Sequence, residues 1–100
     1  MLLNGENVTT MRSMFEGASS FVGDISSWNT AAVDMSSMFR GASSFAQEDL
    51  SRWDTSAVTT MRGMFYGASS FDGDISAWNT AAVFDLNQMF KGATSFNQDL

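Results

Sequence analysis

Apolar residues return along this chain at a nearly fixed step, with polar residues between them. The string Met-Phe-x-Gly-Ala-x-Ser-Phe begins four times, at Met14, Met38, Met64 and Met89. Two other apolar types keep almost the same step, at Trp28, Trp53 and Trp78 and at Val8, Val33, Val58 and Val83. Self-similarity at a fixed period is typical of stacked repeats, and this pattern predicts four coils of about 25 residues each.

Each coil is predicted to have two halves of different local structure. In the first half, apolar residues fall three or four apart, which places them on one face of a short helix. In the third coil these residues are Val58, Met61, Met64, Phe65 and Ala68. Thr55 or Ser56 is the expected N-cap, and Gly67 is the expected stop. The second half, residues 71–78, is too short for a helix and predicts a brief strand at residues 74–77.

One coil alone cannot bury enough apolar surface to fold, so its neighbours must cover it. Equivalent strands would then pair one above another. The predicted fold class is an α/β solenoid of four coils, each with one short strand and one short helix; an all-β helix is the alternative. A length of 100 residues fits one domain that spans residues 1–100.

Composition removes several classes of function. The chain has no cysteine and no histidine, which excludes disulfides, thiol nucleophiles, imidazole bases and nearly every zinc or haem site. Eleven acidic residues against five basic ones give a formal charge of −6, which disfavours nucleic acid and anionic membranes as partners. No apolar run approaches membrane-spanning length. Residues 1–6 lack the basic start of a signal peptide.

Aspartate occupies one repeat position throughout, at Asp24, Asp49, Asp74 and Asp99. Stacked strands would bring these carboxylates close enough to share a cation such as calcium. However, no loop has the dense Asp spacing of a calcium loop, so we expect hydrogen-bonded structural aspartates and no metal site. Asp24, Asp49 and Asp74 nevertheless stay candidates for a binding surface.

The tryptophan column has two readings. Trp28, Trp53 and Trp78 lie three residues after Ile25, Leu50 and Ile75. Strict strand alternation would turn the indoles outward as an aromatic strip suited to a sugar or a protein. If the strand ends early and the chain turns, the indoles enter the core, and this is the reading that we favour. The three tryptophans are thus candidate binding residues whose burial decides their role.

The ends of the sequence suggest a second kind of contact. Because 100 is four times 25, a second molecule placed after Leu100 continues the repeat in register, with Leu3 in the tryptophan column. Both ends are expected to expose apolar and strand-edge groups. The candidate residues for end-to-end contact are Leu2, Leu3, Phe96 and Leu100. Such a contact is heterologous and produces open filaments unless rotation closes it.

The repeat also resembles the BspA-like leucine-rich repeat family of mycoplasma lipoproteins and listerial surface proteins. The resemblance is carried by Val-Thr-Thr-Met-Arg-Gly-Met-Phe-Tyr-Gly-Ala at residues 58–68, Phe-Asn-Gln-Asp-Leu at 96–100 and Ser-Arg-Trp-Asp-Thr-Ser at 51–56. It implies a right-handed leucine-rich-repeat-like solenoid, a cell-surface or extracellular location and a role in adhesion. It implies no catalytic residue and no cofactor.

The sequence therefore predicts a non-enzymatic interaction or adhesion module that presents a repeated surface to a protein or glycan. No nucleophile–base pair, phosphate loop or cluster of metal ligands supports an enzyme. The alternative is a structural unit that stacks head to tail into homo-oligomers or filaments.

Overall fold

Equivalent stretches of the four repeats fold alike in the computed structural model, which describes residues 10–26, 34–47 and 49–97. We call residues 10–17, 34–41, 60–67 and 85–92 the turn segments. In each of them, alternate amides close a tight turn by donating to the carbonyl three residues earlier. In the first segment Met14 N donates to Met11 O at 3.2 Å and Glu16 N donates to Ser13 O at 3.1 Å.

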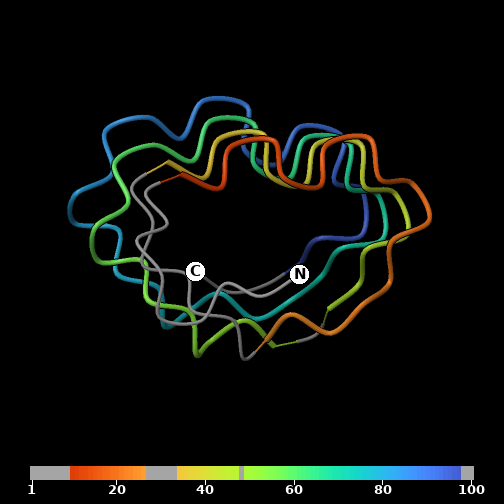
Figure 1. Ribbon diagram of the computed structural model, residues 1–100, viewed down its shortest axis with the longest axis horizontal. Helices are drawn as coiled ribbons and strands as arrows, with labels where there is room; N and C mark the ends of the chain where they lie inside the picture. Colours follow the sequence, from red (N-terminus) through yellow and green to blue (C-terminus); the bar gives the residue numbers. More distant parts are fainter. Residues whose placement is uncertain (1–9, 27–33, 48, 98–100) are drawn as a thin grey trace.

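In the first three turn segments, every other amide donates to the next segment along the chain. Four bonds of 2.7–3.0 Å join the first segment to the second, from Met11, Ser13, Phe15 and Gly17 to the carbonyls of Asp34, Ser36, Met38 and Arg40. The equivalent four bonds join the second segment to the third and the third to the fourth. Figure 1 shows these segments running side by side along one edge of the molecule. Backbone groups are thus satisfied half within a repeat and half between repeats.

The helix expected over residues 58–68 is wrong. Gly63 has a φ of 60° and Gly67 a φ of 72°, and these left-handed residues interrupt any helical run. Half of the amides also point to the neighbouring segment, so they cannot donate back along a helix. Thr55 is not an N-cap either, because its hydroxyl bonds the backbone of Asn79, donating to its carbonyl at 3.2 Å and accepting its amide at 3.0 Å.

Extended structure is limited to single parallel bridges. One row of bridges runs Thr10 to Asp34, Asp34 to Thr60 and Thr60 to Asp85, and a separate bridge joins Asp49 to Asp74. Of the strand expected at residues 74–77, only the bridge at Asp74 forms. The described part of the chain therefore contains no helix and no strand longer than a bridge.

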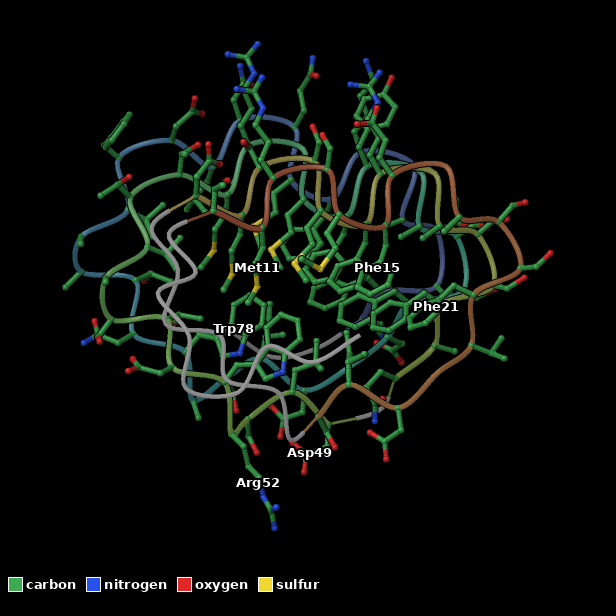
Figure 2. All side chains as sticks on the ribbon, viewed as in Figure 1. Met11, Phe15, Phe21, Asp49, Arg52 and Trp78 are labelled. Atoms are coloured by element: carbon green, nitrogen blue, oxygen red, sulfur yellow. The ribbon has the colours of Figure 1, made fainter. Side chains whose placement is uncertain are left out.

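Aromatic rings stacked in columns fill the core. The rings of Phe15, Phe39, Phe65 and Phe90 follow one another at centroid distances of 5.4–5.7 Å. A second column, of Phe21, Phe45, Phe71 and Phe96, has distances of 5.7–6.0 Å. Within a repeat the two columns also touch, as between Phe65 and Phe71 at 4.1 Å. Figure 2 shows the rings packed beneath the turn segments beside the methionines.

The molecule is compact, with a radius of gyration of 12.2 Å and extents of 32 × 28 × 20 Å. A 100-residue domain is expected to have a radius of about 13 Å. The described residues contain no helix that is long and apolar enough to cross a bilayer. The fold is a compact globule built on a large buried aromatic cluster.

Candidate binding surface

The tryptophans that the structure describes belong to the core. Trp53 is 4% exposed and Trp78 is 8% exposed, and their rings stack at 6.0 Å. Trp53 Nε1 donates to Ile25 O at 3.0 Å, and Trp78 Nε1 donates to Leu50 O at 2.9 Å. The reading as an outward aromatic strip is wrong for these two residues, because each indole turns inward to pair a buried carbonyl. Trp28 lies outside the described residues.

Asp24 and Asp49 are exposed and Asp74 is half-buried, and each of the three shapes its own loop. Asp24 Oδ1 accepts Ser26 N at 3.0 Å, and Asp74 Oδ1 accepts Ser76 N at 3.0 Å. Asp49 makes the same turn with Ser51. Hydrogen bonds from these serines hold the pKa of each of the three carboxyls below its usual value. Among the described residues no group of three or more acidic side chains is placed to hold a metal ion.

Of the residues considered for end-to-end contact, the structure describes Phe96 alone. Its ring is half-buried and stacks on Phe71 at 5.8 Å and on Phe90 at 4.2 Å. Leu2, Leu3 and Leu100 lie outside the described residues.

The turn segments form a polar face that the sequence analysis did not single out; we call it the turn face. Four of the five basic residues of the chain project from it, at two repeat positions. One position holds Arg12, Ser36, Arg62 and Asn87, and the other holds Glu16, Arg40, Tyr66 and Lys91. The fifth basic residue, Arg52, extends from the opposite side, as Figure 2 shows. The concentration of cations at two repeat positions was the signal in the sequence.

A polar hollow of about 350 Å³ lies between the two positions. Arg12, Arg40 and Arg62, which come from three successive repeats, help to line it. The lining is completed by Asp34, Ser36, Ser37, Thr60, Gly63 and Gln88. Since no apolar side chain is among these residues, the hollow suits a polar ligand.

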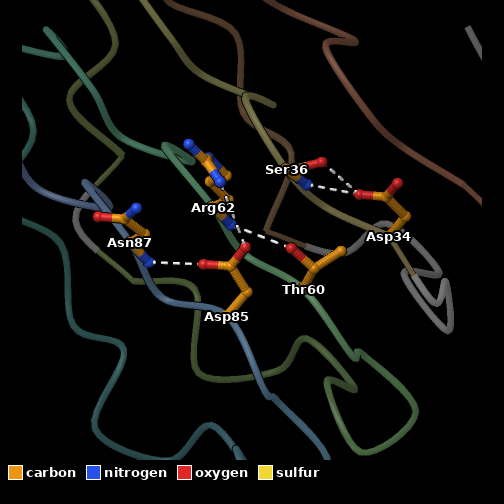
Figure 3. A network of polar contacts seen from close by, with 6 residues as sticks. All are labelled: Asp34, Ser36, Thr60, Arg62, Asp85 and Asn87. Carbon is orange, nitrogen blue, oxygen red and sulfur yellow. Dashed lines mark hydrogen bonds and ion pairs between the residues drawn. The ribbon is translucent and has the colours of Figure 1, made fainter.

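Side chains of the bridge row hold the turns that shape this hollow. Asp34 Oδ1 accepts the amide of Ser36 at 2.9 Å, and Thr60 Oγ1 accepts the amide of Arg62 at 3.4 Å. Asp85 Oδ1 accepts the amide of Asn87 at 2.9 Å, and its other oxygen lies 3.8 Å from the Arg62 guanidinium. Figure 3 shows this network. The backbone beneath the arginines is therefore fixed by local capping bonds.

Tyr66 lies beside two cations at the repeat position that it shares with Arg40 and Lys91. The Arg40 guanidinium lies 4.4 Å from the ring centroid, and the Lys91 ammonium lies 5.9 Å from it. Cations at these distances are attracted by the ring quadrupole. Tyr66 therefore attracts two cations of the turn face to its ring.

Fold and surface together define a class, a repeat protein in which hydrogen-bonded turn segments cover a stacked aromatic core and carry a basic, polar face. Residues 2–100 match the family described as "Mycoplasma protein of unknown function, DUF285". The match covers nearly the whole chain, and the chain belongs to this family. No curated protein and no solved structure matches the chain.

Proposed function

We propose that the chain is a solenoid that works as a non-enzymatic interaction module, with the turn face as its binding surface. The bonds between turn segments support the solenoid, because the same four bonds join each segment to the next one along the chain. A right-handed, leucine-rich-repeat-like course and a cell-surface or extracellular location are further parts of this proposal. They rest on the resemblance to BspA-like repeats.

The observation that carries the function is a contrast between core and surface. Inward positions of the turn segments repeat almost unchanged, as at Phe15, Phe39, Phe65 and Phe90. Outward positions change from repeat to repeat, as at Glu16, Arg40, Tyr66 and Lys91. A constant core beneath a surface of varied charged and aromatic side chains is typical of a binding protein. Binding depends on the side chains at the site, while the fold holds them in place.

Arrays of glycans and of proteins test this function. The wild-type chain is screened first, and every ligand found is then measured against Tyr66→Ala and Lys91→Ala. Both variants should weaken binding without altering the circular dichroism spectrum, because both side chains are exposed or half-buried on the turn face. Arg52→Ala, on the opposite side, is the control and should bind like the wild type. Ligands that ignore every change on the turn face would rule the proposal out.

Self-assembly is the second candidate function, and unpaired backbone groups favour it. Within the described residues the amides of Leu86, Gln88, Phe90 and Gly92 have no hydrogen-bond acceptor, and the carbonyls of Thr10, Arg12, Met14 and Glu16 have no donor. These groups are the equivalents of those that join successive turn segments. A second copy can therefore extend the stack with the bonds that already hold it together.

An apolar hollow of about 210 Å³ adjoins the unpaired amides, and Leu86, Trp78 and Met89 help to line it. Leu86 is 50% exposed. Sedimentation over a concentration series should show association of the wild type and loss of association in Leu86→Lys. Phe84→Lys is the matched control, because Phe84 is 79% exposed but does not line the hollow. A wild type that stays monomeric at high concentration eliminates this candidate.

A further inference from the structure

We infer that the polar hollow of the turn face binds acidic carbohydrate, an oligosaccharide that carries carboxylate or sulfate groups. The inference rests on the proposed function, because it names the ligand class of the same face. Its grounds are the arginines, the polar lining and the spacing of the repeats.

Three arginines line the hollow, and few acidic groups pair with them. Neither Arg12 nor Arg40 forms an ion pair in the part of the chain that the structure describes. Arg62 has Asp85 at 3.8 Å, and its side chain is 58% exposed. A planar guanidinium offers paired donors that match the oxygens of a carboxylate or sulfate. The arginines are thus available to an anion from outside.

Asp34, the carboxylate that lines the hollow, is engaged in its own turn. Its Oδ1 accepts the amide of Ser36 at 2.9 Å and the hydroxyl of Ser36 at 2.5 Å. Three basic residues and one acidic residue therefore line the hollow, and the acidic residue accepts hydrogen bonds from a serine. In a chain of net charge −6, this concentration of cations attracts anions locally while the rest of the surface repels them.

The rest of the lining favours a sugar over an acidic peptide. Clusters of arginine recognise acidic peptide motifs as well as acidic sugars, so the choice rests on the other residues of the hollow. This hollow has no apolar side chain and offers the hydroxyls of Ser37 and Thr60 and the amide of Gln88. Hydroxyls and amides fit the many hydroxyl groups of a saccharide, while the arginines take its acidic groups.

The repeat also sets the spacing of the anions. Successive turn segments are separated by 5.6 and 5.4 Å, measured between the ring centroids of Phe15, Phe39 and Phe65. Arg12 and Arg62 occupy the same repeat position two repeats apart, so their bases are separated by about twice this step. A linear saccharide with acidic groups on separate sugar units has the spacing to contact both.

Isothermal titration calorimetry with four defined probes tests the inference. The probes are a uronate hexasaccharide, a sulfated hexasaccharide, a neutral hexasaccharide and hexa-aspartate. At least one acidic saccharide should bind, more weakly as salt rises, while the neutral saccharide and the peptide should not. Uronate binding without sulfate binding assigns the carboxylate as the recognised group, and the reverse assigns the sulfate.

Three variants connect binding to the hollow. Arg62→Gln should weaken binding at least about tenfold, the effect of losing hydrogen bonds to a charged group. Arg62→Lys should recover part of the loss, because it restores the charge but not the paired donors. Arg52→Gln makes the same change of charge on the opposite side and should match the wild type.

Several results would overturn the inference. They are equal binding of Arg62→Gln and Arg52→Gln, tighter binding of hexa-aspartate than of both acidic saccharides, and no binding of either acidic saccharide. The proposed function fails separately, when no ligand from the arrays responds to Tyr66→Ala or Lys91→Ala. A neutral or peptidic ligand that does respond leaves the interaction module standing and removes the acidic carbohydrate.

Discussion

At the scale of single residues, the tryptophans join neighbouring repeats as well as filling the core. Each described indole donates to a carbonyl 28 residues earlier, from Trp53 to Ile25 and from Trp78 to Leu50. An indole has one donor, and a buried carbonyl without a partner is costly. The column thus explains why tryptophan, and not phenylalanine, stands at this repeat position.

Trp53→Phe should lower the free energy of unfolding by about 1–3 kcal/mol, because it leaves Ile25 O without the indole donor and shortens a buried ring. Urea denaturation followed by circular dichroism measures the change. Arg52→Ala, at the exposed neighbouring position, should stay within about 0.5 kcal/mol of the wild type. Equal stability of Trp53→Phe and wild type would show that the indole bond is not formed.

Acid should destabilise the chain through its Asp–Ser turns. Hydrogen bonds to serine lower the folded-state pKa of Asp24, Asp49, Asp54 and Asp74 from 3.8. The unfolded state therefore binds protons more readily than the folded state. The contribution of these carboxylates to stability is fully present above pH 3.8 and is lost as the pH falls through the lower folded pKa values. Urea midpoints between pH 6 and pH 2, taken in the wild type, measure this loss.

The variant Asp54→Asn/Asp74→Asn serves as the comparison for the acid experiment. The amide oxygen of asparagine still accepts the serine hydrogen bonds but does not titrate in this range. The midpoint of the variant should therefore fall less steeply with acid. Identical slopes for variant and wild type would remove these two carboxylates as the cause.

At the scale of the element, the turn segment explains what the sequence could and could not predict. The period, the inward methionines and phenylalanines and the bridge at Asp74 follow from the spacing of residues. The helix does not, because apolar spacings of three and four suit a run of tight turns as well as a helix. Gly63, in the middle of the expected helix, is the residue that argues against a helix. Glycine has a low helix propensity and adopts positive φ freely.

The turn face was missed for a related reason. In isolation Arg12, Arg40 and Arg62 are exposed charges on an acidic chain. Arg12 and Arg62 share one repeat position but Arg40 occupies the other, so the repeat period alone does not bring the three together. They line one hollow because the positive φ of Ser37 and Gly63 folds the backbone between the two basic positions.

The left-handed glycines of the turn segments should resist substitution. Gly67→Ala should cost about 1–2 kcal/mol, the penalty for a side chain in the left-handed region. Space is not the cause, because the added Cβ would lie 3.7 Å from Gly41 N, an ordinary contact. Ser70→Ala, an exposed change a short way along the chain, is the control for thermal or urea unfolding. An unchanged midpoint for Gly67→Ala would contradict the assigned backbone.

At the scale of the whole molecule, stability depends on register between repeats. The stretch of chain that links the first two turn segments, 18–33, is shorter than the stretch that links the next two, 42–59. The same four hydrogen bonds nevertheless join each pair of segments. The loops between the segments therefore absorb a residue lost or gained, while the segments themselves stay aligned. Alignment also keeps the phenylalanine columns continuous, so backbone bonds and ring stacking reinforce one another.

An internal deletion tests this dependence on register directly. Removing residues 61–85 joins Thr60 to Leu86, which occupies the repeat position of Met61. The shortened chain should fold with lower stability and a urea m-value near three quarters of the wild-type value, because m scales with the surface exposed on unfolding. Removing residues 61–86 instead shifts every later residue by one position within a turn segment, where alternate amides have different partners and alternate side chains different surroundings. That chain should show no cooperative unfolding transition by circular dichroism. A slip of one residue exchanges the amides that close turns for the amides that join neighbouring segments. If the two deletion variants were equally stable, the repeats would therefore not hold one another in register.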